Sequence, residues 1–323
     1  MLNKKLFTIK QEEKPTREGF GEALLDIGKT NEKVVALCAD LTESVKMDKF
    51  RDAFPERFFE MGITEQGMSG VASGLASCGY NPFMASYAMF SPGRNWEQIR
   101  TTICYNNVPV KVVGAHAGIS VGPDGATHQA IEDIALMRIL PNMNVFVPCD
   151  AVEAYAITKF LGKFDHPAYL RLTREKTPVI LNDDYEFSFG KAIVMQIPKK
   201  DFKNKVGIIS CGPIIYEALK AAKELEKDGI GVTVVNMPTI KPLDTKFLLR
   251  FAKNVQAIVT VEEHQIAGGL GSAVAEFLSE YHPIKIARVG IDDRFGQSGK
   301  QPELYEEYGL TSKHIVEKVK SII

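Results

Sequence analysis

One acidic residue, Glu65, stands in a run of small and apolar residues, Gly62-Ile63-Thr64-Glu65-Gln66-Gly67-Met68, for which we predict a helix. A carboxylate there lies either near the helix N-terminus, where the helix dipole stabilises negative charge, or in an apolar pocket, where burial disfavours the charged form. Either placement makes Glu65 a candidate for acid–base chemistry. A capping or solvent-exposed glutamate is the alternative.

Two aromatic residues follow, Tyr87 and Phe90, and their spacing of three predicts that they share one face of a helix. Such a pair can stack on a flat ligand, because aromatic faces attract one another. Ordinary packing in the hydrophobic core is the alternative, and the residues alone leave both interpretations open.

A glycine-rich stretch, residues 114–129, carries His116, Asp124 and His128. Its glycines predict a loop, and binding residues are common on loops. Asp124 and His128 permit a metal-site interpretation, but a third ligand at the usual spacing is missing. Structural histidines satisfied by the backbone are a further alternative.

Three polar residues, Arg17, Ser44 and Arg174, stand at predicted ends of elements. Arg174 ends a predicted strand at residues 168–172, and Ser44 follows another at 34–39. Ligands bind at the carboxyl ends of parallel strands in open α/β sheets. Taken singly, each residue is equally typical of a solvated side chain.

The elements that position these residues alternate between short apolar runs and amphipathic segments. The runs predict buried parallel strands, and the amphipathic segments predict helices. Strands are predicted at residues 34–39, 108–114, 144–147, 168–172, 206–210, 232–236, 257–261 and 285–289, and helices at 15–29, 151–161, 214–228, 271–281 and 311–323, the last capped by Thr311. The fold class is therefore α/β, with two domains, each a mostly parallel sheet with helices on both faces.

The 323 residues also suit two domains at a prior of about 150 residues each. We predict a loose polar arm at residues 1–14, a first domain at 15–180, a linker with one hairpin at 181–205 and a second domain at 206–323.

Composition excludes several classes of protein. A net charge of −1 argues against a nucleic-acid binder, although a local basic pocket remains compatible with it. The five cysteines show no C-x-x-C spacing, so we expect neither a disulfide framework nor a structural zinc site. No signal peptide and no apolar run of membrane-spanning length is evident, and we expect a cytoplasmic location.

These motifs together resemble the pyrimidine-binding domain of transketolase, a thiamine-diphosphate enzyme. The second half, with Glu262-Glu263-His264, Gly268-Gly269-Leu270-Gly271 and Asp293-Arg294-Phe295-Gly296, resembles the C-terminal domain of the same family. The glycines at 268–271 in isolation also suggest a phosphate-binding loop. The resemblance extends from about Lys14 to the end of the sequence.

The resemblance implies a role for each candidate residue. Glu65 would contact N1′ of the aminopyrimidine, Tyr87 and Phe90 would stack on that ring, and Asp40 would lie at a cofactor-facing subunit interface. His128 would contact the donor sugar at C1, with a catalytic role, and Asp124 a hydroxyl near C2. His116, Arg17, Ser44 and Arg174 would bind the phosphate end of the sugar. Transketolases commonly have Phe where Tyr87 stands, and the third aromatic residue of some members is replaced by Gly93.

The family's G-D-G…N motif, which holds Mg²⁺ and the diphosphate of the cofactor, is missing from the sequence. We therefore expect the C-terminal subunit of a split transketolase of the pentose phosphate pathway. An N-terminal partner subunit would supply the Mg²⁺ and diphosphate site, in a heterotetramer. The pair would transfer a two-carbon ketol unit between sugar phosphates.

Other members of the wider family stay open. The β subunit of 2-oxo acid dehydrogenases has the same layout but needs no sugar-phosphate site. Deoxyxylulose-phosphate synthase shares the Asp-Gly-x-Thr-His stretch, yet is usually one chain and commonly has His where Gly67 stands. A catalytically inactive, ligand-binding relative is the alternative from a different functional class.

Overall fold

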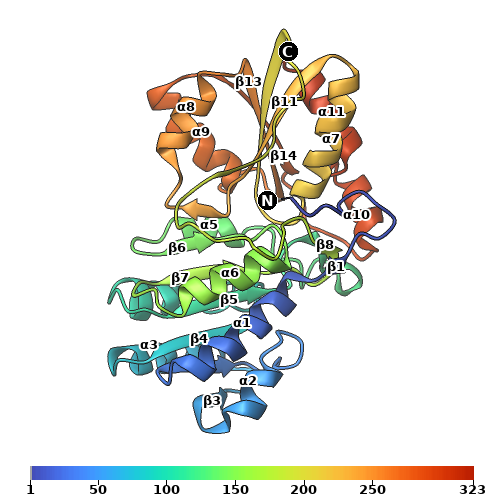
Figure 1. The fold of residues 1–323 in the computed structure, drawn as a ribbon. Coiled ribbons are helices and arrows are strands. Elements are labelled where there is room, and N and C mark those ends of the chain that lie inside the picture. Colours follow the sequence, from blue (N-terminus) through green and yellow to red (C-terminus); the bar gives the residue numbers. More distant parts are fainter. Residues whose placement is uncertain (1) are drawn as a thin grey trace.

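The computed structural model describes residues 2–323, which form two large sheets, one above the other in Figure 1, and a two-stranded sheet. The first sheet has seven strands in the order β12-β6-β7-β5-β4-β2-β3, and only β12 runs antiparallel to its neighbour. Its strands are β2 (Val34–Cys38), β3 (Phe58–Glu60), β4 (Asn81–Tyr87), β5 (Lys111–Ala115), β6 (Asn144–Phe146), β7 (Ala168–Arg171) and β12 (Thr239–Lys241).

Helices cover both faces of this sheet because its strands are apolar on both sides. In β2, Val34 and Ala36 face one core cluster, and Val35 and Leu37 face another. The first cluster is closed by α1 (Thr16–Thr30), α2 (Asp48–Ala53) and α6 (Ala151–Leu161), and the second by α3 (Glu65–Ser77), α5 (Asp133–Arg138) and the π-helix η2 (Ile99–Cys104). The short helices η1 (Pro55–Arg57), α4 (Trp96–Gln98) and η3 (Ile119–Asp124) complete this part of the chain.

The second sheet has five strands in the order β14-β13-β10-β11-β9. These are β9 (Ile193–Gln196), β10 (Asn204–Ser210), β11 (Ile230–Asn236), β13 (Ala257–Gln265) and β14 (Lys285–Ile291). Figure 1 shows α7 (Ile215–Lys227) and α11 (Ser312–Lys320) on one face, and α8 (Thr245–Ala252) and α9 (Leu270–Tyr281) on the other. Helix α10 (Gln301–Glu307) lies on the side toward the first sheet. The α/β fold class is confirmed.

Three local expectations were wrong. The N-terminal residues are not a loose arm, because Leu6 is buried in the core around the second sheet, and β1 (Glu13–Lys14) pairs with β8 (Thr177–Pro178). The predicted hairpin does not form, because β9 instead pairs antiparallel with β11. Thr311 stands at the N-cap position of α11, but its hydroxyl contacts the ring of His314 instead of a backbone amide.

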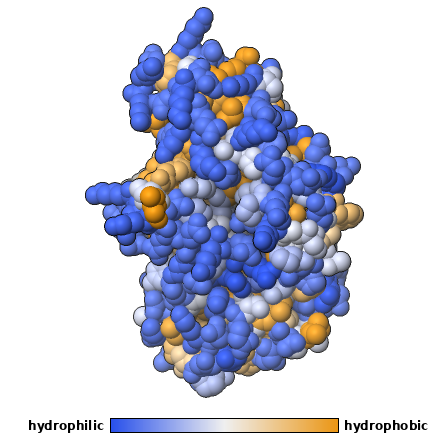
Figure 2. Space-filling model, turned by 90° about the vertical axis from the view of Figure 1, so that its right-hand side faces the viewer, coloured by the Kyte–Doolittle hydropathy of each residue, from blue (hydrophilic) through white to orange (hydrophobic). Residues whose placement is uncertain are grey.

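Within residues 2–323, no helix is both long enough and apolar enough to cross a membrane. The face of the molecule in Figure 2 is largely hydrophilic, with hydrophobic residues in small separate groups. The five cysteines are free thiols, and Cys78 is the exposed one.

Candidate functional site

The carboxyl ends of four neighbouring parallel strands, β7, β5, β4 and β2, bring most of the predicted site residues to one edge of the first sheet. Tyr87 is the last residue of β4, and His116 directly follows β5. Arg174 comes after β7, and Ser44 comes after β2. Ligand sites of open α/β sheets lie at such an edge.

The rings of Tyr87 and Phe90 lie side by side, with centroids 6.0 Å apart and planes 12° apart. They do so without the predicted helix, because Tyr87 ends a strand and Phe90 lies in the turn that follows. Tyr87 also stacks on His116 at 3.8 Å, and His128 meets Phe90 edge-on at 5.5 Å. Four aromatic rings, from the end of β4, the turn after it and the segment after β5, thus form one cluster.

His116 is 2% exposed and has a left-handed backbone conformation, with φ of 55°. Burial first, and then the charges of Arg17 and Arg174, lower the pKa of His116 to about 3. Its Nε2 lies 3.4 Å from Nη1 of Arg17, which can only donate, so the neutral ring carries its proton on Nδ1. Nδ1 is buried and has no hydrogen-bond partner among the described residues, which leaves a donor available for a ligand.

Arg17, in the first turn of α1, connects His116 to the segment after β2. Its Nη1 also donates to the backbone oxygen of Ser44 at 2.6 Å. Its Nε is buried without a hydrogen-bond partner in the described chain. Burial is the main cause that lowers the pKa of Arg17 from its ordinary value.

Arg174 and Asp124 form an ion pair at 3.2 Å, and both side chains are about one third exposed, at 31% and 33%. Nη1 of Arg174 also donates to the backbone oxygen of Val121 at 2.6 Å. Arg174 thereby binds the loop after β5, which carries Asp124 and His128. The ring of His128 is half-buried, and its Nδ1 lies 3.0 Å from the hydroxyl of Thr127.

Glu65 is the first residue of α3 and is 2% exposed. Nη1 of Arg94 lies 3.0 and 2.9 Å from its two carboxylate oxygens, and the guanidinium stands over the ring of Phe90 at 4.8 Å. Asn95 anchors the start of the helix by donating to the backbone oxygen of Glu65 at 3.2 Å. The structure therefore connects Glu65 to the aromatic cluster through Arg94.

Sequence reasoning missed Arg94, which is 29 residues from Glu65. No periodicity relates the two, since Arg94 belongs to the turn after β4. A signal was nevertheless present, because Arg94 is the one charged residue between Glu65 and Glu97. An isolated cation in so long an uncharged stretch is expected to have a specific partner.

The surface of α3 beside Glu65 is not covered by the rest of the described chain. Gly70 and Gly74 have no atom within 4 Å of where a side chain would begin. Ile63 and Val71 are 70% and 41% exposed. The carboxylate of Glu65 is thus buried, but the small and apolar residues beside it, on and just before α3, are not covered by the rest of the described chain.

Asp40 lies apart from the aromatic cluster. It is exposed, and its backbone N–H donates to Glu60 at 2.7 Å. Glu60 also accepts from the backbone N–H of Gly62 at 3.1 Å, so Asp40 stands beside the segment that leads to Glu65.

The glycine loop at 268–271 does not offer an anion site. The carboxylate of Glu262 accepts from the backbone amides of Leu270 and Gly271 at 2.7 and 2.8 Å. These amides at the start of α9 are therefore already satisfied by the chain itself.

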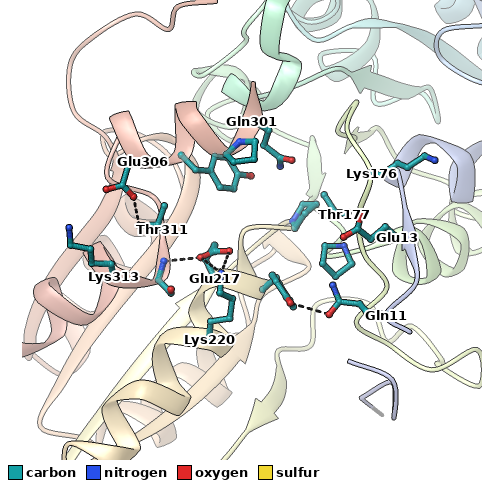
Figure 3. Close-up of a pocket in the computed structure, with 16 residues that line it drawn as sticks. Gln11, Glu13, Lys176, Thr177, Glu217, Lys220, Gln301, Glu306, Thr311 and Lys313 are labelled. Carbon is teal, nitrogen blue, oxygen red and sulfur yellow. Dashed lines mark hydrogen bonds and ion pairs between the residues drawn. The ribbon is translucent and has the colours of Figure 1, made fainter. Parts of the chain in front are cut away.

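Within residues 2–323 no group of three or more His, Cys, Asp or Glu side chains could hold a metal ion. A cavity of about 610 Å³ lies away from the predicted site, between the N-terminal residues, β8 and the helices α7, α10 and α11 (Figure 3). Its lining mixes lysines and glutamates and contains none of the predicted site residues. The predicted site residues therefore lie outside this cavity.

Comparisons with known proteins identify both halves of the chain. The family models "Transketolase, pyrimidine binding domain" and "Transketolase, C-terminal domain" match residues 12–179 and 177–315. A protein of Methanocaldococcus jannaschii, "Putative transketolase C-terminal section", is 42% identical over 95% of both chains. A 6-deoxy-6-sulfo-D-fructose transketolase subunit of Clostridium is 37% identical, over 96% of this chain and 95% of its own length. An apulose-4-phosphate transketolase subunit of Phocaeicola vulgatus is 36% identical, over 93% of this chain and 94% of its own length.

Solved structures agree. "Split gene transketolase, inactive beta4 tetramer" superposes with a TM-score of 0.85 at 45% identity, covering 95% of this chain and 97% of its own. The transketolase of Campylobacter jejuni superposes with a TM-score of 0.81 at 26% identity, covering 98% of this chain and 48% of its own.

Proposed function

Because this chain belongs to the transketolase family, as a C-terminal section of the split kind, we propose that it is the pyrimidine-binding subunit of a thiamine-diphosphate-dependent transketolase. The enzyme transfers a two-carbon ketol unit between sugar phosphates. Glu65 and His128 are its catalytic residues in this chain.

The positive field around His116 carries the proposal. Nη1 of Arg17 lies 3.4 Å from Nε2 of His116, and the charges of Arg17 and Arg174 both lower the pKa of His116, in addition to the effect of burial. Two guanidinium groups close to the same buried histidine are suited to bind a phosphate dianion, because each presents several hydrogen-bond donors in a fixed plane. Neutral His116 adds the free Nδ1–H, and Ser44 lies beside Arg17. These residues bind the phosphate end of the sugar.

The loop that carries Asp124 and His128 lies between the phosphate site and the aromatic rings and binds the hydroxyl groups of the sugar. Asp124 accepts hydrogen bonds from hydroxyls, and His128 can donate or accept near neutral pH. Asp124 is already paired with Arg174, so its carboxylate is held in place before a sugar arrives. His128 lies against Phe90 and faces the reacting end of the donor.

The residues around Glu65 fit the pyrimidine end of thiamine diphosphate. Glu65 would hold a ring nitrogen and a proton on it, Tyr87 and Phe90 would flank the ring, and Asp40 would stand at the nearby subunit interface. The open glycines of α3 leave room for a flat ligand and a covering subunit. When bound, thiamine diphosphate supplies the nucleophilic carbon that accepts the two-carbon unit.

A partner subunit completes the site. We propose that it carries the diphosphate and Mg²⁺ site, covers the face of α3 that exposes Ile63 and Val71, and forms a heterotetramer with this chain. The related structure described as an inactive β4 tetramer supports self-association of such subunits.

Calorimetric titration of the chain with thiamine diphosphate and Mg²⁺ tests the need for a partner. We expect weak binding and no ketol transfer by the chain alone, because diphosphate–metal contacts supply most of the cofactor's affinity. Micromolar binding without a partner would contradict the two-subunit proposal.

Reconstitution with a diphosphate-binding subunit then tests the reaction. Ketose phosphates should serve as donors and aldose phosphates as acceptors. The panel should include 6-deoxy-6-sulfo-D-fructose and apulose 4-phosphate, because relatives are named for these sugars. Turnover of 2-oxo acids in place of ketoses would contradict a transketolase.

A further inference from the structure

The loop that carries Asp124 and His128 has only the short 3-10 helix η3 as regular structure, and this helix is interrupted at Gly122. The loop runs from Gly118 to His128 as two short turns that meet at Gly122, whose φ is 82°. Gly118 and Gly125 also have positive φ, at 84° and 77°. Such backbone is flexible in isolation, so its position must come from contacts with other elements.

Those contacts come largely from the second domain. Glu263 of β13 is 3% exposed, and its Oε1 accepts the backbone N–H of Ser120 at 2.7 Å. Its Oε2 accepts the hydroxyl of Tyr305, in α10, at 2.8 Å. A side chain at Gly118 would overlap the carboxylate of Glu263, so the loop approaches it as closely as glycine permits.

The segment between β14 and α10 holds the far end of the loop. Gln129 donates to the backbone oxygens of Ile119 and Gln297, both at 3.0 Å. A Cβ at Gly125 would lie only 2.7 Å from the hydroxyl of Ser298. Ile119 is fully buried in the same apolar cluster as Leu304 of α10. Backbone, side-chain and core contacts with the second domain therefore hold the loop, in addition to the contacts of Arg174 from the first domain.

The first domain contacts Glu263 through Arg171. Arg171 of β7 is 3% exposed, donates to the backbone oxygen of Glu263 at 2.8 Å and pairs with Asp133 at 2.8 Å. Arg171 ends β7 and stands three residues before Arg174, so β7 contacts the second domain and the segment directly after it reaches the proposed phosphate site.

We propose, on the basis of the sugar-transfer function above, that the second domain sets the geometry of the sugar site through Glu263, a positioning residue that fixes the loop at Ser120. In this view the second domain is part of the substrate site without touching the substrate. Tyr305 acts with Glu263 by holding its other oxygen.

Hydrogen exchange of the chain alone tests the contact without any assay of activity. In Tyr305→Phe, which removes one hydroxyl, we expect the amide of Ser120 to exchange at least ~10-fold faster, because local protection follows local stability. Glu263→Ala should have a larger effect than Glu263→Gln, since Gln retains an acceptor for the amide. Tyr185→Phe is the matched control, because Tyr185 donates to another buried carboxylate, that of Glu153, at 2.9 Å.

Kinetics of the reconstituted complex test the consequence. Tyr305→Phe should raise the KM for the donor sugar ~5–20-fold, while kcat and the Kd of thiamine diphosphate change less than ~2-fold. Unchanged exchange at Ser120, unchanged KM, or the same changes in Tyr185→Phe would each overturn the proposal. If no sugar phosphate is turned over at all, the proposed function fails, and the exchange rates still decide whether the second domain fixes the loop.

Discussion

Two glutamates of this chain, Glu65 and Glu263, are almost equally buried, at 2% and 3% exposure, but their surroundings differ. Glu263 accepts from a backbone amide and a tyrosine hydroxyl, on one oxygen each. Glu65 has one nitrogen of Arg94 across both oxygens, and the side chain of Arg94 is 48% exposed. The carboxylate of Glu263 is enclosed by the fold, and that of Glu65 is held by a half-exposed cation beside an open surface.

This difference in surroundings indicates that Glu263 has a structural role and that Glu65 is available to a ligand. A carboxylate offers about four acceptor positions, and both hydrogen bonds that the carboxylate of Glu65 accepts within the described chain come from one nitrogen of the half-exposed Arg94, whereas those of Glu263 come from two separate buried groups. Desolvating such a group costs free energy unless partners compensate for it. Retaining Glu65 with so few partners is consistent with a ligand that completes its hydrogen bonds, whereas Glu263 already has its partners within the fold.

The largest expected effect comes from Glu65→Gln in the reconstituted complex. Gln retains the shape but cannot keep a proton on the bound ring, so kcat should fall by ~10²–10⁴-fold while the protein stays folded. The exchange rate of the C2 proton of bound cofactor isolates this step from sugar binding. Glu97→Gln, at an exposed site nearby, is the control. If the C2 proton exchanges equally fast in Glu65→Gln and in the parent protein, Glu65 has no such role and the contrast between Glu65 and Glu263 is wrong.

The arginines of the β7 segment extend the same contrast. Arg171→Ala leaves Asp133 buried without its cation and should cost about 3–5 kcal/mol of stability. Arg174→Ala should leave the stability of the protein nearly unchanged. It should raise the KM for phosphorylated sugars by a factor that corresponds to about 2–3 kcal/mol. A phosphate contact far from the reacting carbons stabilises the bound substrate and the transition state equally, so its loss changes KM and not kcat. Denaturation and steady-state kinetics measure the two effects. An unchanged KM would place Arg174 outside the phosphate site.

Arg94→Met sharpens the contrast at Glu65 itself. Without the cation, Glu65 stays buried with no side-chain partner, and the chain should lose about 1–2 kcal/mol of stability, a value reduced by the exposure of Arg94. Urea unfolding of the single variants and of the double variant with Glu65→Gln gives the coupling energy. Exposed Arg100→Met is the control. Additive effects would mean that the pair contributes no coupling.

The smallest effect concerns pH. Because the pKa of folded His116 is about 3 and that of an unfolded histidine is about 6.5, the unfolded state gains a proton first as pH falls. The contribution of neutral His116 to the free energy of unfolding is complete above pH ~6.5 and is lost progressively toward pH 3. The loss between pH 7 and pH 5 should be about 1–2 kcal/mol. His116→Asn, which tolerates the left-handed backbone, should lack this loss in urea unfolding at the two pH values. His282→Gln controls for removal of a histidine elsewhere, and an equal loss in both variants would contradict the assignment to His116.

Local patterns in the sequence sufficed for much of the fold. Apolar runs predicted most strands of both sheets, and the predicted helix at residues 151–161 has the bounds of α6. Such elements are predictable because burial on one or two faces imposes a period within a few residues. The chemistry-bearing motifs were also local, since Glu65, Tyr87 and the glycine-rich loop each belong to one short segment.

Contacts between distant segments were decided only by the tertiary structure. Arg94 meets Glu65 from 29 residues away, and Glu263 meets Ser120 from 143 residues away. The rings of Tyr87 and Phe90 meet through a strand and a turn, although their spacing predicted a helix. Other parts of the chain likewise supply the surfaces for the packed N-terminal residues, for the edge strand β9 and for β12, which joins the edge of the first sheet. No sequence period encodes such pairings, because the free energy that selects them is gained only when both surfaces are folded and in contact.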